Sequence, residues 1–320
     1  MNYISVAEAA KRWGLSERSV RNYCAQGRIP GALLTGKTWN VPENAEKPAR
    51  KTRSDAGRRD LLTALREEKA TKLHGGIYHK IQIDLTYNSN HIEGSRLTHD
   101  QTRLIFETNT IGMDASVRVD DVVETANHFC CIDLMIDAAN HAITESMIKQ
   151  LHAVLKNGTT DSRKEWFAVG DYKRFPNEVG GRDTTAPEDV PAAMKALLRD
   201  YNAKKEKTFD DLLDFHYRFE RIHPFHDGNG RVGRLLLFKE CLRYGIVPFI
   251  ITDDLKAFYY RGLQTWETEP GCLRDTCGPA QDRFQQVLEY FNIFNSKKRI
   301  SGQDNPARIV QLFINIMSGF

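Results

Sequence analysis

The sequence lacks several features that would assign it to particular classes of protein. Its 320 residues contain no apolar run of eighteen or more, so no membrane-spanning helix is expected. The N-terminus has no charged segment followed by an apolar one and does not resemble a signal peptide. The six cysteines form no Cys-x-x-Cys pair and lie mostly in apolar sequence, which favours reduced thiols in a cytoplasmic protein.

The charge is nearly balanced over the whole chain but not along it. Lys and Arg number 45 against 42 Asp and Glu. Residues 1–60 hold 12 basic and 6 acidic residues, whereas the rest hold 33 and 36. A basic N-terminal segment on an acidic body indicates a separate partner for that segment, and nucleic acid is the partner that such charge suits.

The most informative segment is His223–Arg234, with the sequence His-Pro-Phe-His-Asp-Gly-Asn-Gly-Arg-Val-Gly-Arg. Apolar residues at helical spacing precede it over 209–222 and follow it over 235–242. The segment is therefore predicted to be a loop between two core helices that also opens the second helix.

Glycines and arginines in this loop favour an anionic ligand. Gly228 and Gly230 allow a sharp turn and a close approach of the backbone to a ligand. The N–H groups at a helix start attract anions. Arg231 and Arg234 are three residues apart and share a helical face, where two guanidinium groups suit a polyphosphate.

Two further side chains add chemistry to the loop. Asp227 is an oxygen donor of the kind that binds Mg²⁺ together with substrate phosphates. His223 can accept a proton near neutral pH. A zinc pair of His223 with His226 is the alternative, but Pro224 and the glycines interrupt the helix that would place both on one face.

The whole segment resembles the signature of Fic-domain proteins, His-x-Phe-x-Asp/Glu-Gly-Asn-Gly-Arg-x-x-Arg, with every defined position filled. The resemblance implies a mainly helical bundle that transfers AMP from ATP to a protein hydroxyl, with His223 as the base and Asp227 on Mg²⁺. Lys replaces Gly230 in the related Doc kinases, so the glycine favours adenylyl transfer. The resemblance implies that nucleotide contacts come from Phe225, Gly228, Asn229, Gly230, Arg231 and Arg234.

A second motif, Ser89-Asn-His-Ile-Glu93-Gly94, resembles the Fic inhibitory motif Ser/Thr-x-x-x-Glu-Gly/Asn. In that family the glutamate pairs with the second arginine of the signature, here Arg234. The resemblance implies autoinhibition by an N-terminal helix, in which Glu93 takes the guanidinium that should hold the γ-phosphate. An ordinary glutamate near a helix end is the alternative.

Two other segments resemble parts of Fic proteins. Asp254–Leu263 resembles the helix near the adenine base, which implies that Tyr259 or Tyr260 contacts adenine. For each tyrosine, packing in the core is the alternative. Residues 169–182 have little helical character and indicate a β-hairpin, which the resemblance implies is a flap that pairs with an extended target segment.

Residues 1–46 predict a small domain of their own. A Ser-capped helix, a turn at Gly14 and a second helix over 17–26 precede a hairpin around 35–37. The segment resembles the winged helix-turn-helix of excisionase and MerR-type DNA-binding modules. The resemblance implies DNA contacts from Arg18, Arg21, Arg28 and Lys37. A protein-docking module is the alternative.

The remainder is predicted to be mainly α. Residues 47–59 are a basic linker, 60–300 the Fic domain and 301–320 a C-terminal helical segment. Helices are expected over 60–72, 76–90, 98–108, 115–137, 143–155, 188–203, 208–221, 231–244, 254–267 and 279–296, with Cys272 and Cys277 flanking a loop.

The predicted function is that of a protein adenylyltransferase that uses ATP and Mg²⁺ and modifies a hydroxyl of a target protein or of itself. A DNA-binding regulator whose Fic core senses nucleotide is the first alternative. Removal of AMP, with Glu93 positioning a water, is the second. A homodimer, and a nucleotide donor other than ATP, stay open.

Overall fold

The structure is a computed structural model that describes all residues except 1, 26–27, 37, 48–58, 113–115 and 295–320. Most of the predicted linker and the predicted C-terminal helical segment therefore lie outside the described residues. The chain divides into two compact units, Met1–Gly57 and Arg58–Phe320, and each is described by itself.

The N-terminal unit combines two helices with a three-stranded sheet. Its elements are β1 (Tyr3–Ser5), α1 (Val6–Trp13), α2 (Glu17–Ala25), β2 (Leu33–Thr35) and β3 (Thr38–Pro42). Ser5 and Glu8 form a capping box at the start of α1, and Gly14 ends the helix with a positive φ of 63°. The helices and the hairpin lie where the sequence predicts them, whereas β1, which pairs with β3, was not predicted.

The larger unit contains ten α-helices among its described residues. They are α3 (Leu61–Thr71), α4 (Ile77–Ile92), α5 (His99–Thr108), α6 (Val119–Asp137), α7 (Glu145–Lys156), α8 (Val190–Ala203), α9 (Phe209–Ile222), α10 (Asn229–Tyr244), α11 (Asp253–Thr265) and α12 (Gly271–Tyr290). Two short β-pairs join them. Parallel β4 (Arg59–Asp60) and β7 (Ile293–Phe294) form one, and antiparallel β5 (Glu178–Val179) and β6 (Arg182–Asp183) form the other.

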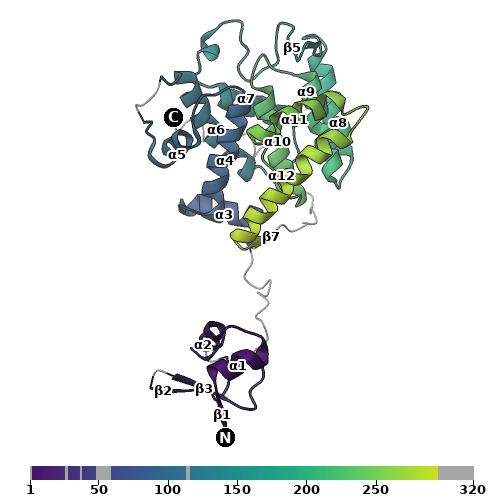
Figure 1. The fold of residues 1–320 in the computed structure, drawn as a ribbon. Helices are drawn as coiled ribbons and strands as arrows, with labels where there is room; N and C mark the ends of the chain where they lie inside the picture. Colours follow the sequence, from purple (N-terminus) through teal and green to yellow (C-terminus); the bar gives the residue numbers. More distant parts are fainter. Residues whose placement is uncertain (1, 26–27, 37, 48–58, 113–115, 295–320) are drawn as a thin grey trace. The chain divides into compact units, whose positions relative to one another are not determined.

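Helix α10 is the centre of this unit (Figure 1). It packs against α9, α6, α4 and α7. Every residue of Arg231–Leu242 is buried, polar ones included. A helix that is buried on all sides has no polar face, so its sequence lacks the alternation of apolar and polar residues that marks an amphipathic helix. For this reason only the apolar residues 235–242 predicted α10 clearly.

Several predicted helix boundaries differ from the structure: α6 begins at Val119 rather than at 115, and α12 ends at Tyr290 rather than at 296. Helix α12 begins at Gly271 rather than at 279 and continues through Pro279, so Cys272 and Cys277 lie in a helix and not beside a loop. Burial of Leu273 and Cys277 against α11 stabilises this turn in spite of the proline. Helix α10 begins at Asn229, inside the predicted loop.

The described residues contain no helix long and apolar enough to cross a membrane. All six cysteines have free thiols.

Candidate active site

His223 lies at the point where α9 ends. Its φ is 51°, and its N–H donates to the Phe219 carbonyl at 3.0 Å, which closes the helix and turns the chain into the loop. Burial, helped by the charge of Lys173, lowers the pKa of His223 to about 4. The imidazole is therefore neutral at pH 7 and able to accept a proton.

The loop after His223 is held from inside by two side chains that were predicted to contact nucleotide. Phe225 is fully buried, and its ring stacks on His152 with the centroids 3.9 Å apart. Asn229 accepts a hydrogen bond from the Phe225 N–H at 2.8 Å and donates to the Phe225 carbonyl at 2.9 Å. The buried Phe225 ring anchors the loop and the Asn229 amide fastens it, and the nucleotide contacts of both residues stay predictions.

His152 is a second anchor that the sequence did not reveal. Its Nδ1 accepts from the Gly170 N–H at 2.9 Å, so the proton is on Nε2, which donates to the Asp227 carbonyl at 3.1 Å. Burial lowers the pKa of His152 to about 3, so the ring is neutral at pH 7. One histidine in an apolar helix gives no sequence signal that distinguishes this role from simple packing.

The two loop glycines are required for different reasons. Gly228 has a φ of 81° and is the N-cap of α10, where it offers no side chain to accept from the first N–H groups of the helix. Gly230 is already helical, and a Cβ there would overlap the Glu93 carboxylate. The first glycine makes the turn and the second makes room beside the helix N-terminus.

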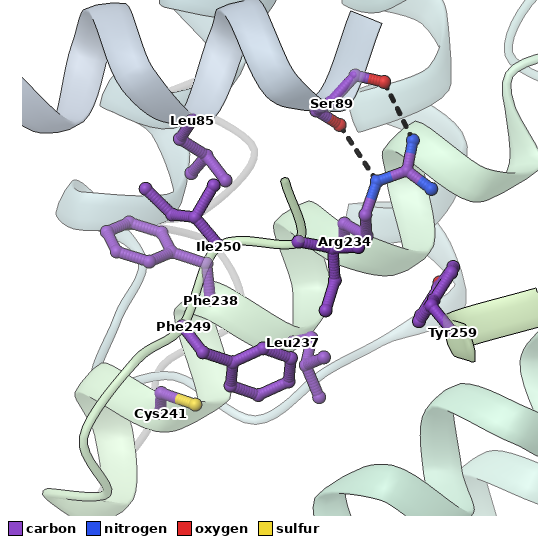
Figure 2. A pocket seen from close by; sticks show the side chains of 10 residues that line it. Leu85, Ser89, Arg234, Leu237, Phe238, Cys241, Phe249, Ile250 and Tyr259 are labelled. Atoms are coloured by element: carbon purple, nitrogen blue, oxygen red, sulfur yellow. Dashed lines mark hydrogen bonds between the residues drawn. The ribbon is translucent and has the colours of Figure 1, made fainter. Parts of the chain in front are cut away.

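Arg231 and Arg234 are buried and bind different partners, rather than forming one exposed pair. Arg231 donates to Glu124 on α6 and, at 3.1 Å, to Asp227. Arg234 donates from Nε to the Ser89 hydroxyl at 3.0 Å and from Nη2 to the Ser89 carbonyl at 2.9 Å. Figure 2 shows this contact at one end of an apolar pocket lined by α4 and α10.

Glu93, at the end of α4, forms an ion pair with Arg234. Its Oε1 lies 2.7 Å from Arg234 Nη2. Burial lowers the pKa of Arg234, but Glu93 outweighs this effect and the pKa is raised. The carboxylate also lies beside Gly230, at the helix N-terminus where an anion is favoured. The Glu93 carboxylate therefore lies at a position that would suit a phosphate group.

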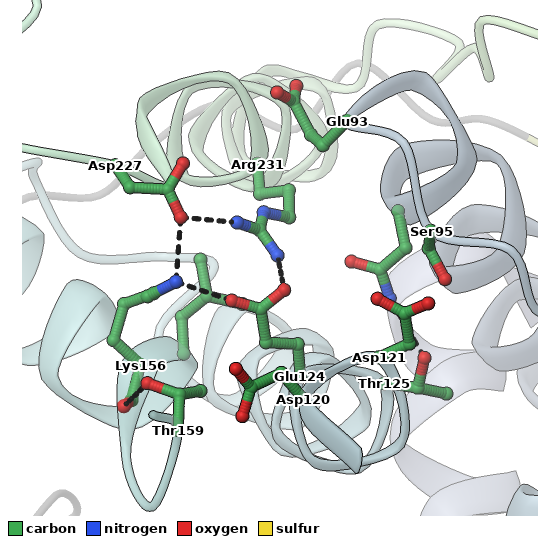
Figure 3. Close-up of polar contacts among 12 residues, drawn as sticks. Glu93, Ser95, Asp120, Asp121, Glu124, Thr125, Lys156, Thr159, Asp227 and Arg231 are labelled. Atoms are coloured by element: carbon green, nitrogen blue, oxygen red, sulfur yellow. Dashed lines mark hydrogen bonds and ion pairs between the residues drawn. The ribbon is translucent and has the colours of Figure 1, made fainter. Parts of the chain in front are cut away.

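Asp227 belongs to a network of four charged groups (Figure 3). Its Oδ2 accepts from Lys156 at 2.6 Å and from Arg231 at 3.1 Å. Burial raises its pKa, but Arg231 and Lys156 outweigh burial, and the pKa lies well below its usual value. Sequence reasoning missed Lys156 and Glu124, since nothing in their local sequence links them to the loop.

Asp227, the predicted Mg²⁺ ligand, has some of the properties that a metal ligand needs. The Asp227 side chain is ionised and 45% exposed, as a ligand that meets a metal–nucleotide complex should be. Within the described residues no three His, Cys, Asp or Glu side chains are grouped to hold a metal ion. His226, the alternative zinc ligand, accepts from the Arg174 N–H at 2.9 Å through Nε2.

The predicted hairpin is present as β5 and β6 and is fastened to the loop. Its leading segment donates from the Lys173 N–H to the Pro224 carbonyl at 2.8 Å and from the Asn177 amide to the Phe225 carbonyl at 3.0 Å. The Lys173 ammonium donates to Asn177 at 2.7 Å and to Thr184 at 2.5 Å. The hairpin base and the loop thus form one connected unit.

The two tyrosines predicted at the adenine base lie in different places. Tyr259 is 1% exposed, and its hydroxyl hydrogen-bonds His216 at 2.5 Å, so it packs in the core. Tyr260 lines a pocket with Val179 of the hairpin and Glu220 of α9. Tyr259 also lines the pocket of Figure 2, so contact with adenine stays a prediction for both tyrosines. Burial raises the pKa of Glu220 to about 8, and sequence reasoning missed this residue.

The predicted DNA contacts are only partly described. The side chain of Arg18 and all of Lys37 lie outside the described residues. Arg21 is exposed and pairs with Glu17 on the same helix at 2.6 Å, and the Arg28 guanidinium lies over the Tyr23 ring at 4.5 Å.

Comparison with known proteins agrees with this geometry. The Fic/DOC family matches residues 142–240, which include α7, the hairpin, the loop and most of α10. Over these residues the chain is similar to the Fic/DOC family. Helix α4, with Glu93, lies outside the matched residues.

Curated relatives extend the likeness beyond the domain. The protein adenylyltransferase Fic of Drosophila melanogaster is 29% identical over 236 residues, which cover 71% of this chain and 45% of the relative. That of Drosophila erecta is 28% identical over 236 residues, with 71% and 45% covered. The chain thus spans less than half the length of these relatives.

Solved structures share the fold. A Fic domain-containing signaling protein from Bacteroides thetaiotaomicron is 26% identical with a TM-score of 0.55, over 81% of this chain and 97% of that one. Fic-1 from C. elegans has a TM-score of 0.54 at 21% identity, over 71% and 69% of the two chains, which is a likeness of fold alone. The larger unit therefore has the mainly α Fic-type fold.

Proposed function

We propose that this chain transfers AMP from ATP to a hydroxyl side chain of a protein and that Glu93 restrains the reaction. The observation that carries the proposal is the position of the neutral His223 imidazole in a loop that leads directly into a helix N-terminus whose N-cap is a glycine. A proton acceptor and an anion site in one loop are the two parts that attack on a phosphate requires.

In this mechanism His223 accepts the proton of the target hydroxyl. The oxygen forms a bond to the α-phosphorus, the bond from that phosphorus to the β-phosphate oxygen breaks, and pyrophosphate leaves. N–H groups at the start of α10 stabilise charge on the α-phosphate. Asp227 would hold Mg²⁺, which neutralises phosphate charge when it is bound.

Restraint follows from the contacts of Arg234. To hold the β- or γ-phosphate, its guanidinium must exchange Glu93 for a phosphate oxygen, and the Glu93 carboxylate repels that phosphate. ATP then binds with its α-phosphate misaligned for in-line attack. The contact of Glu93 with Arg234 supports this autoinhibition, and the ordinary-glutamate alternative does not account for it.

The test uses ATP labelled on the α-phosphate and the Glu93→Gly background. Addition of His223→Ala should abolish transfer of the label while ATP binding persists, because only the base is lost. His99→Ala, which removes an exposed imidazole on α5, is the matched control and should leave transfer unchanged. Transfer by the His223→Ala variant at the rate of its parent would overturn the assignment of the base.

Removal of AMP is the competing reaction at the same site, with Glu93 positioning a water. It predicts the opposite response to Glu93→Gly, which should abolish release of AMP from a modified target. Incubation of the wild-type chain with its own AMP-modified form separates the two directions.

We also propose that the N-terminal unit binds DNA. Its two helices, its hairpin and its basic charge support this role. Arg21→Glu in the full chain should weaken retention of DNA in a gel-shift experiment and leave AMP transfer intact. Equal retention by both proteins would favour the protein-docking alternative.

A further inference from the structure

Lys156 is the last residue of α7, and Figure 3 shows its ammonium between the carboxylates of Asp227 and Glu124. Its Nζ lies 2.5 Å from Glu124 Oε1, 2.6 Å from Asp227 Oδ2 and 3.4 Å from Asp161 Oδ2. The three acids come from α6, the loop and a short 3₁₀ turn at Asp161–Arg163. Only 2% of the Lys156 side chain is exposed, so the ammonium is a fixed part of the site.

Arg231 closes this network into a ring of alternating charge. It donates to the second oxygen of Glu124 and shares Asp227 Oδ2 with Lys156. Two cations therefore hold the carboxylate that the proposed function assigns to Mg²⁺. Both partners reach Asp227 through Oδ2, so the carboxylate is oriented as well as neutralised.

The ammonium lies among oxygens of the kind that bind divalent cations. Carboxylate oxygens are the preferred ligands of Mg²⁺, and an ammonium has three donors for three such oxygens. A lysine ammonium carries a positive charge at neutral pH. A divalent cation that approaches Asp227 meets this charge, and the two repel.

We propose that Lys156 is a positioning residue that holds Asp227 and excludes divalent cations from the nucleotide-free protein, so that the metal enters only together with a nucleotide. The phosphates bring the additional negative charge that the ring lacks. The inference rests on the proposed function only for the presence of a metal in the reaction, and it needs no turnover to be tested.

The experiment measures binding of Mn²⁺, a spectroscopic substitute for Mg²⁺, to the nucleotide-free full chain by electron paramagnetic resonance. Lys156→Met removes the charge and keeps most of the side-chain volume. It should bind Mn²⁺ at least about tenfold more tightly than the wild type, because two close carboxylates then face an unoccupied position. Lys164→Met is the matched control, since Lys164 also pairs with Asp161, at 2.7 Å, but its side chain is exposed and lies outside the ring that holds Asp227.

Loss of the cation also leaves Glu124 and Asp227 to repel each other, so Lys156→Met should melt at a lower temperature, and Mn²⁺ should restore much of that loss. The double variant Lys156→Met/Glu124→Gln restores the charge balance, and it should fold without Mn²⁺ and bind it weakly. This variant keeps the test valid if the single one does not fold.

Equal Mn²⁺ affinity of the wild type and Lys156→Met would overturn the inference, as would tight Mn²⁺ binding by the nucleotide-free wild type. Absence of AMP transfer in any variant would count against the proposed function and leave the Mn²⁺ result unaffected.

Discussion

The carboxylate of Glu93 lies 2.7 Å from the guanidinium of Arg234, although 141 residues separate them in the chain. The contact joins the end of α4 to the first turns of α10, next to the loop that carries His223. It brings together the two sequence motifs that resemblance alone had linked. The proposed inhibitory contact and the proposed phosphate contact therefore involve the same residue, Arg234.

Ser89 shares this arginine and gives a graded test of the restraint. Its hydroxyl accepts from Arg234 Nε at 3.0 Å in a buried position. Ser89→Ala should cost about 1–3 kcal/mol of stability because it leaves a buried donor without an acceptor. It should activate AMP transfer less than Glu93→Gly does, since the carboxylate remains. Initial rates of both variants, with Ser95→Ala as the control, check this order.

Phe225 should determine whether the loop keeps its shape. Its buried ring packs on His152, and its backbone is held by Asn229. Phe225→Ala should reduce the free energy of unfolding by about 3–5 kcal/mol, as expected for a buried aromatic residue. AMP transfer should fall in the fraction that stays folded. Urea denaturation measures the first effect, and an unchanged midpoint would contradict the assigned role.

Asn177 fastens the hairpin to the loop through the Phe225 carbonyl and the Lys173 ammonium. Asn177→Ala should loosen the hairpin without unfolding the unit, because β5 and β6 are short and exposed. Limited proteolysis should then cleave faster near Gly180–Gly181. Glu178→Ala, an exposed change in the same hairpin, is the control, and equal cleavage of the two would argue against a fastening role for Asn177.

Buried histidines should make the fold sensitive to acid. Burial lowers the pKa values of His128, His152 and His216 to about 3, from about 6.5 in an unfolded chain. Below about pH 6.5 the unfolded chain therefore binds more protons, and stability falls as pH decreases.

The free energy of unfolding should change by up to about 1.4 kcal/mol per pH unit for each of the three histidines. Glu220, whose pKa is raised to about 8, opposes this trend in the same range, because it is protonated when folded and ionised when unfolded. Urea unfolding at several pH values gives the net pH dependence of the free energy of unfolding. His128→Gln should reduce this dependence by the contribution of one histidine, because one proton fewer is taken up on unfolding. A stability that rose on acidification would show that these rings are not neutral in the fold.

The extent of sequence-based prediction differs between local and long-range features. The helices, the hairpin and the loop followed from period, capping and turn residues that are local to each segment. The pairing of Arg231 with Glu124, and that of Asp227 with Lys156, depends on how α6, α7 and α10 pack, and no local pattern encodes it. For the same reason Phe225 and Asn229, read as ligand contacts, were found holding the loop.

The start of α12 illustrates the opposite error. The sequence predicts a loop between Cys272 and Cys277 and a helix from 279, whereas burial against α11 extends the helix back to Gly271. Tertiary packing outweighed the local cost of the proline.

The most direct test of the account is intact-mass spectrometry of the wild type, Glu93→Gln and Glu93→Gln/His223→Ala after incubation with Mg²⁺ and ATP. The account predicts that Glu93→Gln gains the mass of one or more AMP groups, that the wild type gains far less, and that the double variant gains none. No added mass on Glu93→Gln with ATP, or equal modification of Glu93→Gln and the double variant, would contradict it.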